Sequence, residues 1–136
     1  MCVFCSIISG EIPSYKLYED EETLAFLEID PSSPGHALII PKKHVEDFMD
    51  LDNKLMVPVM GSVQKVAKMI EKALGADNFT IGVNSGKIVG RHVEHVHVHV
   101  IPRFPNDEGH YIQGVVSRSS KETLEEVRDK IIKDGN

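Results

Sequence analysis

The chain has 136 residues, of which 41% are hydrophobic and 26% are charged, and these values are typical of a folded globular protein rather than a disordered one. Its formal net charge of −6 at pH 7 argues against broad binding to nucleic acids or anionic membranes, although local donors can still hold a small phosphorylated ligand. No apolar run approaches the roughly 20 residues of a membrane helix and the N-terminus has no signal-peptide pattern, so we expect one cytoplasmic domain over residues 1–136.

The N-terminus carries the only two cysteines of the chain, Cys2 and Cys5, at the spacing of a zinc knuckle. In a reducing compartment a CxxC pair is typical of a metal or redox site rather than of a structural disulfide. Two cysteines supply half of a four-ligand zinc site, so the histidines are candidates for the other half. Without a metal, both cysteines would be free thiols.

The segment that follows is predicted to form three strands. Strand-like runs at residues 15–19 and 23–29 flank an acidic turn at residues 20–22. A turn cluster of proline, serine and glycine covers residues 30–35, and a compact apolar strand follows at residues 36–41.

A long helix is predicted from about Asn53 to Leu74. Asp50 or Asp52 can cap its N-terminus, and Gly75 ends it. Apolar residues recur along it every three to four positions, as on the buried face of an amphipathic helix. This stripe consists of Leu55, Val59, Val63, Val66, Ile70 and Leu74. Three methionines lie on or near the stripe, and we expect them to fill the core: Met56, Met60 and Met69.

A fourth strand is predicted at residues 78–84 and a fifth begins at His95, with a glycine-containing loop at residues 85–91 before it. The glycines of this loop permit close approach of the backbone to a ligand. After Arg103 the chain becomes polar, and a last amphipathic helix is predicted at residues 120–133, capped by Ser119 or Ser120. Strands with two segregated helices indicate an α+β domain with an antiparallel sheet.

Three histidines, His95, His97 and His99, alternate with valines at the start of the fifth strand. On a strand, alternate residues point the same way, so the valines would pack inward and the imidazoles would stand in a row at a repeat of roughly 6–7 Å. One histidine is usually an ordinary polar-face residue, but three in register each need a hydrogen-bond partner if they are buried. The row therefore indicates a functional site.

The segment from His95 to Ile101 matches the His-φ-His-φ-His-φ-φ signature of the histidine triad (HIT) superfamily of nucleotide hydrolases and transferases, where φ is a hydrophobic residue. Residues 4–13, 25–29 and 34–44, and the loop that opens with Asn84, also resemble blocks of this family, in the family's order. The N-terminal CxxC resembles the zinc-containing bacterial and archaeal members. The tail after about Asn106 is less diagnostic.

The resemblance implies a HIT-like α+β fold, with a five-stranded antiparallel sheet, one long helix and a C-terminal helix. It also implies a homodimer whose sheets continue across the interface, and a purine-nucleotide site on the histidine face. The expected activity is that of a nucleotidyl hydrolase. Its substrate would be a nucleoside phosphoramidate or a dinucleoside polyphosphate, and its product a nucleoside monophosphate.

The resemblance assigns catalytic roles to two of the histidines. His97 would attack the α-phosphate and form a nucleotidyl-histidine, because a neutral imidazole avoids part of the repulsion that a charged phosphate exerts on nucleophiles. His99 would hydrogen-bond to phosphate oxygens or to the bridging atom. Fixed donors for the charge of the transition state would come from Asn84 and from the backbone between Gly90 and His92.

The resemblance gives His95 a different role. In family members with an N-terminal CxxC, the first triad histidine and the histidine after Pro-Lys-Lys bind zinc together with the two cysteines. The corresponding ligands here are Cys2, Cys5, His44 and His95. Four protein ligands fill tetrahedral zinc and leave no open position, so this zinc would be structural.

The nucleoside pocket that the resemblance implies is lined by Phe26, Leu27 and Ile29. Where the family more often has an aspartate that binds the ribose hydroxyls, this chain has Glu28, followed by Asp30 two residues later.

The chain departs from the family pattern just before the triad, at Arg91, His92 and Glu94. Arg91 replaces a neutral amide, and His92 replaces a residue that usually faces the leaving group. A permanent cation favours phosphate contacts, so one hypothesis is that Arg91 biases the enzyme towards polyphosphate leaving groups. The alternative is an exposed arginine in a loop.

Two other function classes fit the residues. The three histidines can bind a catalytic zinc in a metallohydrolase, but this leaves Cys2, Cys5 and His44 without a joint explanation. The chain can also be a nucleotide-binding regulatory or scaffold protein whose hydrolysis is incidental.

Overall fold

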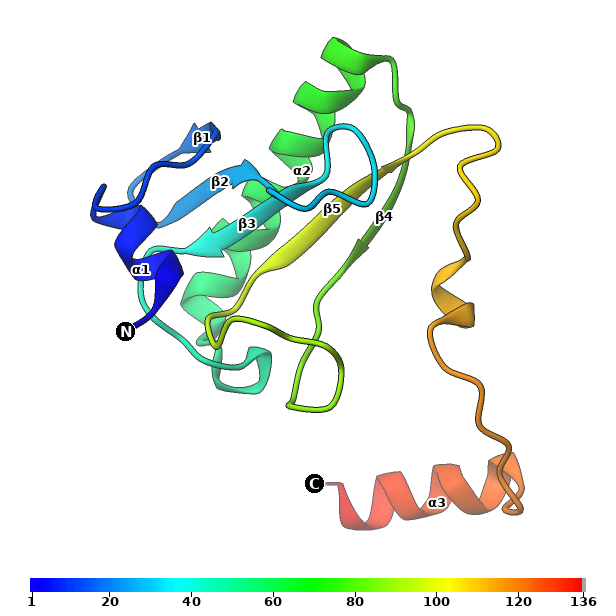
Figure 1. The fold of residues 1–136 in the computed structure, drawn as a ribbon. Coiled ribbons are helices and arrows are strands. Elements are labelled where there is room, and N and C mark those ends of the chain that lie inside the picture. Colours follow the sequence, from blue (N-terminus) through cyan, green and yellow to red (C-terminus); the bar gives the residue numbers. More distant parts are fainter. Residues whose placement is uncertain (136) are drawn as a thin grey trace.

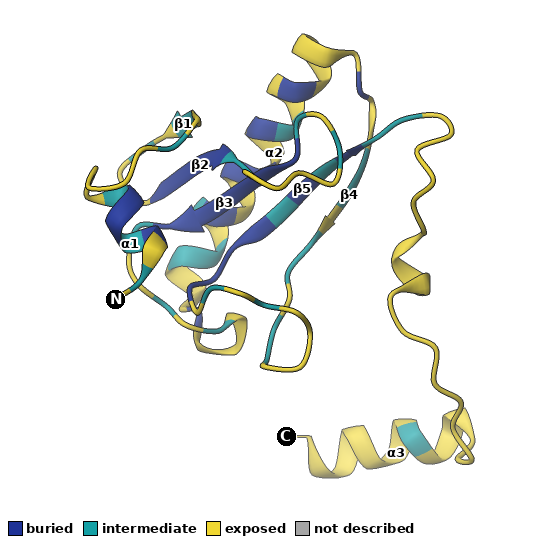
Figure 2. Ribbon diagram, in the orientation of Figure 1, coloured by how far each residue is buried: buried dark blue, intermediate teal, exposed yellow. Residues whose placement is uncertain are grey.

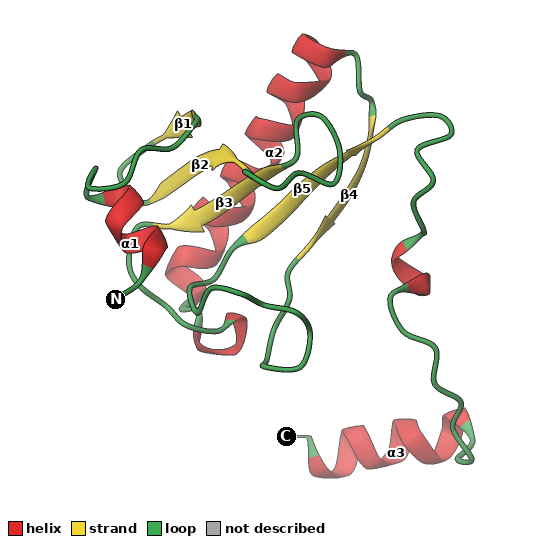
Figure 3. Ribbon diagram, in the orientation of Figure 1, coloured by secondary structure: helices red, strands yellow, loops and turns green. Residues whose placement is uncertain are grey.

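A five-stranded antiparallel sheet with the strand order β1-β2-β3-β5-β4 organises the chain in a computed structural model that describes residues 1–135 (Figures 1 and 3). The strands are β1 (Lys16–Glu19), β2 (Thr23–Leu27), β3 (Ala37–Pro41), β4 (Asn78–Gly82) and β5 (Val98–Arg103). The α-helices are α1 (Val3–Ile8), α2 (Asn53–Leu74) and α3 (Leu124–Asp134), and short 3₁₀ turns lie at Phe48–Asp50 and Ile112–Gly114. The predicted α+β class and antiparallel five-stranded sheet are confirmed.

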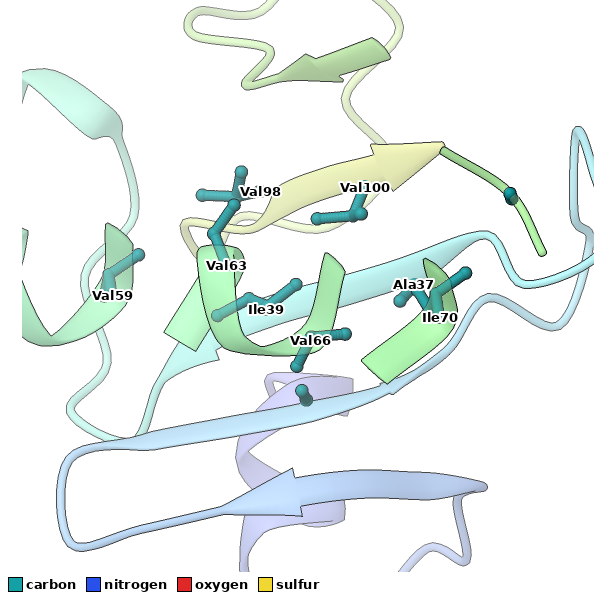
Figure 4. Packing of buried hydrophobic residues seen from close by; sticks show 10 residues of the cluster. Ala37, Ile39, Val59, Val63, Val66, Ile70, Val98 and Val100 are labelled. Carbon is teal, nitrogen blue, oxygen red and sulfur yellow. The ribbon is translucent and has the colours of Figure 1, made fainter. Parts of the chain in front are cut away.

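Helix α2 covers one face of the sheet and forms the main core with it (Figure 4). Four residues of the predicted stripe are buried against the strands: Val59, Val63, Val66 and Ile70. They pack on Ile39 of β3 and on Val98 and Val100 of β5, all exposed by 2% or less. The inward orientation predicted for the valines of the histidine segment is thus confirmed for Val98 and Val100, and Val96 is buried outside this cluster.

The ends of α2 follow from local chemistry. The Asp52 carboxylate accepts a hydrogen bond from the Lys54 N–H and caps the N-terminus, and Gly75 ends the helix in the left-handed conformation with φ 69°. The prediction that the methionines fill the core is wrong for two of them, since Met60 and Met69 are 45% and 40% exposed. Each follows or precedes a buried stripe residue by one position, and a step of one residue turns a helix by about 100° away from the core.

The opposite face of the sheet is covered by α1, which the sequence analysis did not predict (Figures 1 and 2). Phe4 and Ile7 of this short helix are buried against Leu24, Phe26 and Leu38 of the sheet. The second cluster is therefore built around an aromatic pair, whose ring centroids lie 5.5 Å apart in an edge-to-face arrangement.

Strand β5 begins at Val98, whereas the sequence predicts a strand from His95. Its pairing with β3 runs from Ala37 opposite Val100 to Ile39 opposite Val98, and stops there. Upstream, the Val96 N–H donates to the carbonyl of Val45 instead, so His95 and His97 lie before the strand and only His99 of the triad lies within it.

The C-terminal tail extends away from the sheet (Figures 1 and 2). Every residue from Pro105 to Gly135 is exposed except Val127, which is half-buried. The last helix begins at Leu124 rather than at residue 120, because Thr123 and Glu126 form a capping box that the predicted serines do not. Among residues 1–135, none of the helices combines the length and the apolar character that crossing a bilayer requires.

Candidate functional site

A cavity of about 580 Å³ lies on the face of the sheet that carries α1, between that helix, β2, β3 and the loop before the triad. Its walls include nine of the ten residues predicted to bind nucleotide: Phe26, Leu27, Glu28, Ile29, Asn84, Gly90, His92, His97 and His99. The segments that contribute them lie up to 73 positions apart in the chain, from Phe26 to His99. The tenth residue, Arg91, is not part of the wall.

His97 is 8% exposed and lines the cavity. Its Nδ1 lies 2.7 Å from the carbonyl oxygen of His95. A carbonyl only accepts hydrogen bonds, so Nδ1 carries the proton and Nε2 carries the lone pair. Burial lowers the pKa of His97, so the neutral form dominates at neutral pH. The side chain is therefore held in the form in which an imidazole acts as a nucleophile.

His99 lies beside His97, with ring centroids 5.1 Å apart, and its proton is placed by His36. The Ser32 N–H donates to Nδ1 of His36 at 3.1 Å, so the His36 proton is on Nε2. That nitrogen lies 2.9 Å from Nδ1 of His99 and donates to it. The His99 proton is consequently on Nε2, where it is available to a ligand.

Burial and the neighbouring His97 and His36 lower the pKa of His99 to about 4, and burial lowers the pKa of His36 as well. The sequence pattern predicts His36 only as the first residue of a strand. A histidine placed directly before an apolar strand is nevertheless a signal of a site, since a polar ring at that position needs a buried partner.

The ring of Phe4 fixes the position of two triad histidines. Its centroid lies 5.3 Å from that of His97 and 5.9 Å from that of His95, both edge-to-face. Helix α1 thereby contributes to both clusters, because its Phe4 contacts the triad and Cys2 and Cys5 lie at its N-terminal end.

A second cluster lies at the N-terminal end of α1. The ligand atoms of Cys2, Cys5, His44 and His95 all lie within 4.8 Å of one another. Nδ1 of His95 is 3.4 Å from Sγ of Cys2, 3.7 Å from Sγ of Cys5 and 3.3 Å from Nδ1 of His44. Tetrahedral zinc with ordinary bond lengths separates its nitrogen and sulfur ligands by roughly 3.3–3.8 Å. The four side chains therefore fit a zinc ion.

The protonation of His95 supports the same interpretation. Its Nε2 lies 2.8 Å from the carbonyl oxygen of Pro41, so Nε2 donates and the lone pair of Nδ1 points into the cluster. Burial lowers the pKa of this fully buried ring and keeps it neutral, as a metal ligand must be. Burial and the adjacent Cys2 raise the pKa of Cys5, an effect that a bound cation would reverse.

Ile29, at the cavity, is more exposed to solvent than the triad histidines are. Ile29 is 86% exposed, and Oε1 of Glu28 accepts a hydrogen bond from the backbone N–H of Asp30 at 3.1 Å. Glu28 and Asp30 both line the cavity, so either carboxylate is within its reach.

Arg91 is turned away from the cavity. One guanidinium nitrogen, Nη1, donates to Oδ2 of Asp47 at 2.9 Å and to the carbonyl of Glu46 at 2.6 Å. The side chain is 6% exposed, so Arg91 is not an exposed loop residue, and its charge contributes to lowering the pKa of His97.

Comparisons with known proteins agree with this arrangement. A family model described as the HIT domain matches residues 9–106. The chain is 43% identical over 107 residues to the adenosine 5'-monophosphoramidase hnt1 of Schizosaccharomyces pombe, a match that covers 79% of this chain and 77% of that protein.

Two solved structures resemble the fold. A HIT family protein from Bacillus anthracis superposes with a TM-score of 0.86 at 34% identity, over 98% of this chain and 94% of that one. A zinc-bound histidine triad family protein from Mycobacterium smegmatis superposes with a TM-score of 0.75 at 35% identity, over 93% of this chain and 88% of that one.

Proposed function

The chain belongs to the HIT domain family, and on this premise we propose that it hydrolyses purine nucleotide derivatives at the α-phosphate through a covalent nucleotidyl-His97 intermediate. The bond that breaks joins the α-phosphate to an amine or to a second phosphate, and a nucleoside monophosphate is released. The name of the Schizosaccharomyces pombe relative favours an amine as the first leaving group to test.

The observation that carries this proposal is the proton placement at the triad. His97 donates through Nδ1 to the carbonyl of His95, so its lone pair is on Nε2 and its ring is held in place. A fixed, neutral nucleophile in a cavity next to a hydrogen-bond donor suits attack on a phosphoryl group.

In the first step, Nε2 of His97 forms a bond to the α-phosphorus and the bond to the leaving group breaks. The Nε2–H of His99 hydrogen-bonds to the bridging atom or to a phosphoryl oxygen, where charge develops. In the second step, water cleaves the P–N bond to His97. In the first step His99 gives its Nε2 proton to a leaving amine, and in the second step the water gives its hydroxide to phosphorus and its proton back to His99, so one water is consumed overall.

The remaining walls of the cavity hold the nucleotide. Phe26 and Ile29 offer apolar surface to the base, and Glu28 and Asp30 offer carboxylates to the ribose hydroxyls. Asn84 and the backbone of Gly90 supply polar contacts on the triad side.

We assign Cys2, Cys5, His44 and His95 as ligands of a structural zinc ion. With four protein ligands the metal has no open coordination position, so it would contribute folding energy rather than Lewis-acid chemistry. The side chains of the cluster tie α1, and with it Phe4, to the segment that carries His97.

A single-turnover incubation with an adenylated amine tests the proposal. Intact-protein mass spectrometry should detect an adenylylated native chain and chromatography should detect a burst of AMP, whereas His97→Ala should give neither, a loss on the order of 10⁴-fold or more. The matched control is His110→Ala, which makes the same change in the exposed tail and should behave like the native chain.

AMP release that persists in His97→Ala would contradict the assignment of the nucleophile. Tight AMP binding without turnover of the native chain would instead support a nucleotide-binding protein.

A further inference from the structure

Asp47 collects hydrogen bonds from both ends of the loop at residues 85–91. Its Oδ2 accepts from the Gly86 N–H at 2.9 Å and from Arg91 at 2.9 Å, and its Oδ1 accepts from the hydroxyl of Ser85 and from the Met49 N–H. These donors lower the pKa of Asp47 to about 2, so it is ionised at every pH at which the protein works. The carboxylate is the centre of a clasp, which we define as the side chains of Asp47 and Arg91.

Apart from a 3.9 Å contact between the guanidinium of Arg91 and the exposed carboxylate of Glu94, the loop has no other polar anchor in the part of the chain that the structure describes. The described hydrogen bonds of residues 85–91 are made to the Asp47 carboxylate or to the carbonyl of Glu46. None of the described backbone–backbone hydrogen bonds outside helices and strands involves residues 85–91. Ile88 is 99% exposed, so apolar packing does not hold the tip. The position of the loop therefore depends on the clasp.

The two anchored ends are next to the cavity. Asn84 directly precedes the anchored Ser85, and Arg91 lies between Gly90 and His92. The cavity wall includes Asn84, Gly90 and His92. Gly90 adopts a left-handed φ of 75°, which lets the chain turn from the cavity wall into the clasp. Arg91 points away from the cavity so that its two neighbours can line it.

We propose that Arg91 and Asp47 are positioning residues, which hold Asn84, Gly90 and His92 over the catalytic histidines. This proposal replaces the hypothesis that Arg91 contacts the leaving group directly. The kinetic part of its test rests on the proposed function, whereas amide hydrogen exchange tests it without substrate.

A clasp and a phosphate contact predict different patterns of substrate dependence. If Arg91 contacted a polyphosphate leaving group, Arg91→Gln would slow a dinucleoside polyphosphate and spare an adenylated amine, and Asp47→Asn would spare both. If the pair positions the loop, either substitution slows both substrates alike. The two side chains act through one interaction, so the double variant should lose no more than a single variant.

The experiment measures kcat and KM of Asp47→Asn, Arg91→Gln and the double variant with an adenylated amine and with a dinucleoside polyphosphate. We expect kcat to fall roughly tenfold in each, with KM changing less than about threefold, because the misplaced groups contact the reacting phosphate. Arg91→Lys should restore most of the activity, since an ammonium can donate to the same two oxygens.

Glu94→Gln is the matched control. Glu94 also faces Arg91, at 3.9 Å from its guanidinium, but its side chain is 64% exposed, so the same loss of one negative charge should leave kcat unchanged. Thermal unfolding of each variant verifies that it is folded.

Amide hydrogen exchange of residues 84–92, measured without substrate, is the readout that does not depend on catalysis. Asp47→Asn and Arg91→Gln should exchange faster here than the native chain and Glu94→Gln. Equal exchange in all four would overturn the clasp. If the native chain released no AMP from either substrate, the proposed function would fail while the exchange data still tested the clasp.

A loss confined to the polyphosphate substrate, or a double variant about a hundredfold slower than the native chain, would overturn the inference in an active enzyme.

Discussion

The two faces of the central sheet are built on different physical principles, although the same strands contribute to both. On the face towards α2, Ile39, Val98 and Val100 pack against an aliphatic helix stripe, and the buried hydroxyls of Thr23 and Ser62 hydrogen-bond to each other. On the opposite face, the neighbouring positions Leu38 and His99 belong to the environment of the cavity. Alternation along one strand therefore separates a core from a reactive site by the thickness of a single sheet.

The difference lies in how each face tolerates change. Burial of aliphatic groups is non-directional and scales with area, so the α2 face depends on volume and shape. The histidine face depends on individual partners, since the Ser32, His36 and His99 chain loses its proton order if one member is removed. We therefore expect substitutions on the α2 face to change stability alone and substitutions on the histidine face to change function.

The largest expected effect on stability concerns the zinc ligands, where the histidine face also contributes to folding. A ligand present at about 1,000 times its Kd stabilises a native protein by about 4 kcal/mol. The purified chain should contain one zinc ion per chain, and its removal by a chelator should lower the free energy of unfolding by an amount of this order. Metal analysis and urea denaturation provide the measurements.

Cys5→Ala is the internal control for this prediction. It should bind zinc poorly, start from the lower stability, and respond little to the chelator. A native chain without bound metal, or one whose stability is indifferent to chelation, would show that the cluster holds free thiols.

The second prediction concerns the α2 face. Ile39→Ala removes a fully buried side chain and should lower the free energy of unfolding by about 3 kcal/mol. Because Ile39 points away from the triad, kcat per folded molecule should stay within about twofold of the native value. Ile131→Ala, in the exposed part of α3, should change stability by less than about 0.5 kcal/mol. A large fall of kcat in folded Ile39→Ala would show that the two faces are coupled.

The third and smallest expected effect is the change of the free energy of unfolding with pH. The folded-state pKa values of His36 and His99 are lowered by burial, that of His99 to about 4. Below pH 6.5 the unfolded chain binds more protons at these residues than the folded chain does. Stability contributed by the neutral rings is therefore complete above pH 6.5 and is lost as the pH falls towards about 4.

Urea denaturation of the zinc-free protein between pH 7.5 and 4.5 measures how the free energy of unfolding changes with pH, without interference from the metal. His99→Asn should reduce the loss of stability towards low pH, because His36, His95 and His97 still contribute to it, whereas the control His110→Ala should leave it unchanged. A native slope of zero in this range would contradict the burial effect.

Several features followed from the sequence because their causes are local or periodic. The stripe of α2, its Asp52 cap and the glycine that ends it are determined by residues within a few positions of one another. The alternation of valine and histidine predicts which side chains enter the core, because the period of a strand is two. The family signature adds the site residues, nine of which line one cavity.

Other features were decided by tertiary contacts, which no local pattern contains. His36 lies 63 positions before His99, and Asp47 lies 44 positions before Arg91, so neither partner is evident from its surroundings in the chain. Helix α1 escaped prediction because six residues do not establish a helical period. The helix is held by its burial against the sheet and by the contacts of Cys2 and Cys5 with His44 and His95.

By itself, then, the sequence determined the composition of the two faces and the identity of the reactive groups, since both depend on the order of residue types along the strands and helix. Only the tertiary structure decided which nitrogen of each histidine carries the proton, and which acceptors bind the guanidinium of Arg91. Both depend on which distant acceptor the fold places within about 3 Å, and a hydrogen bond exists only where that distance is met.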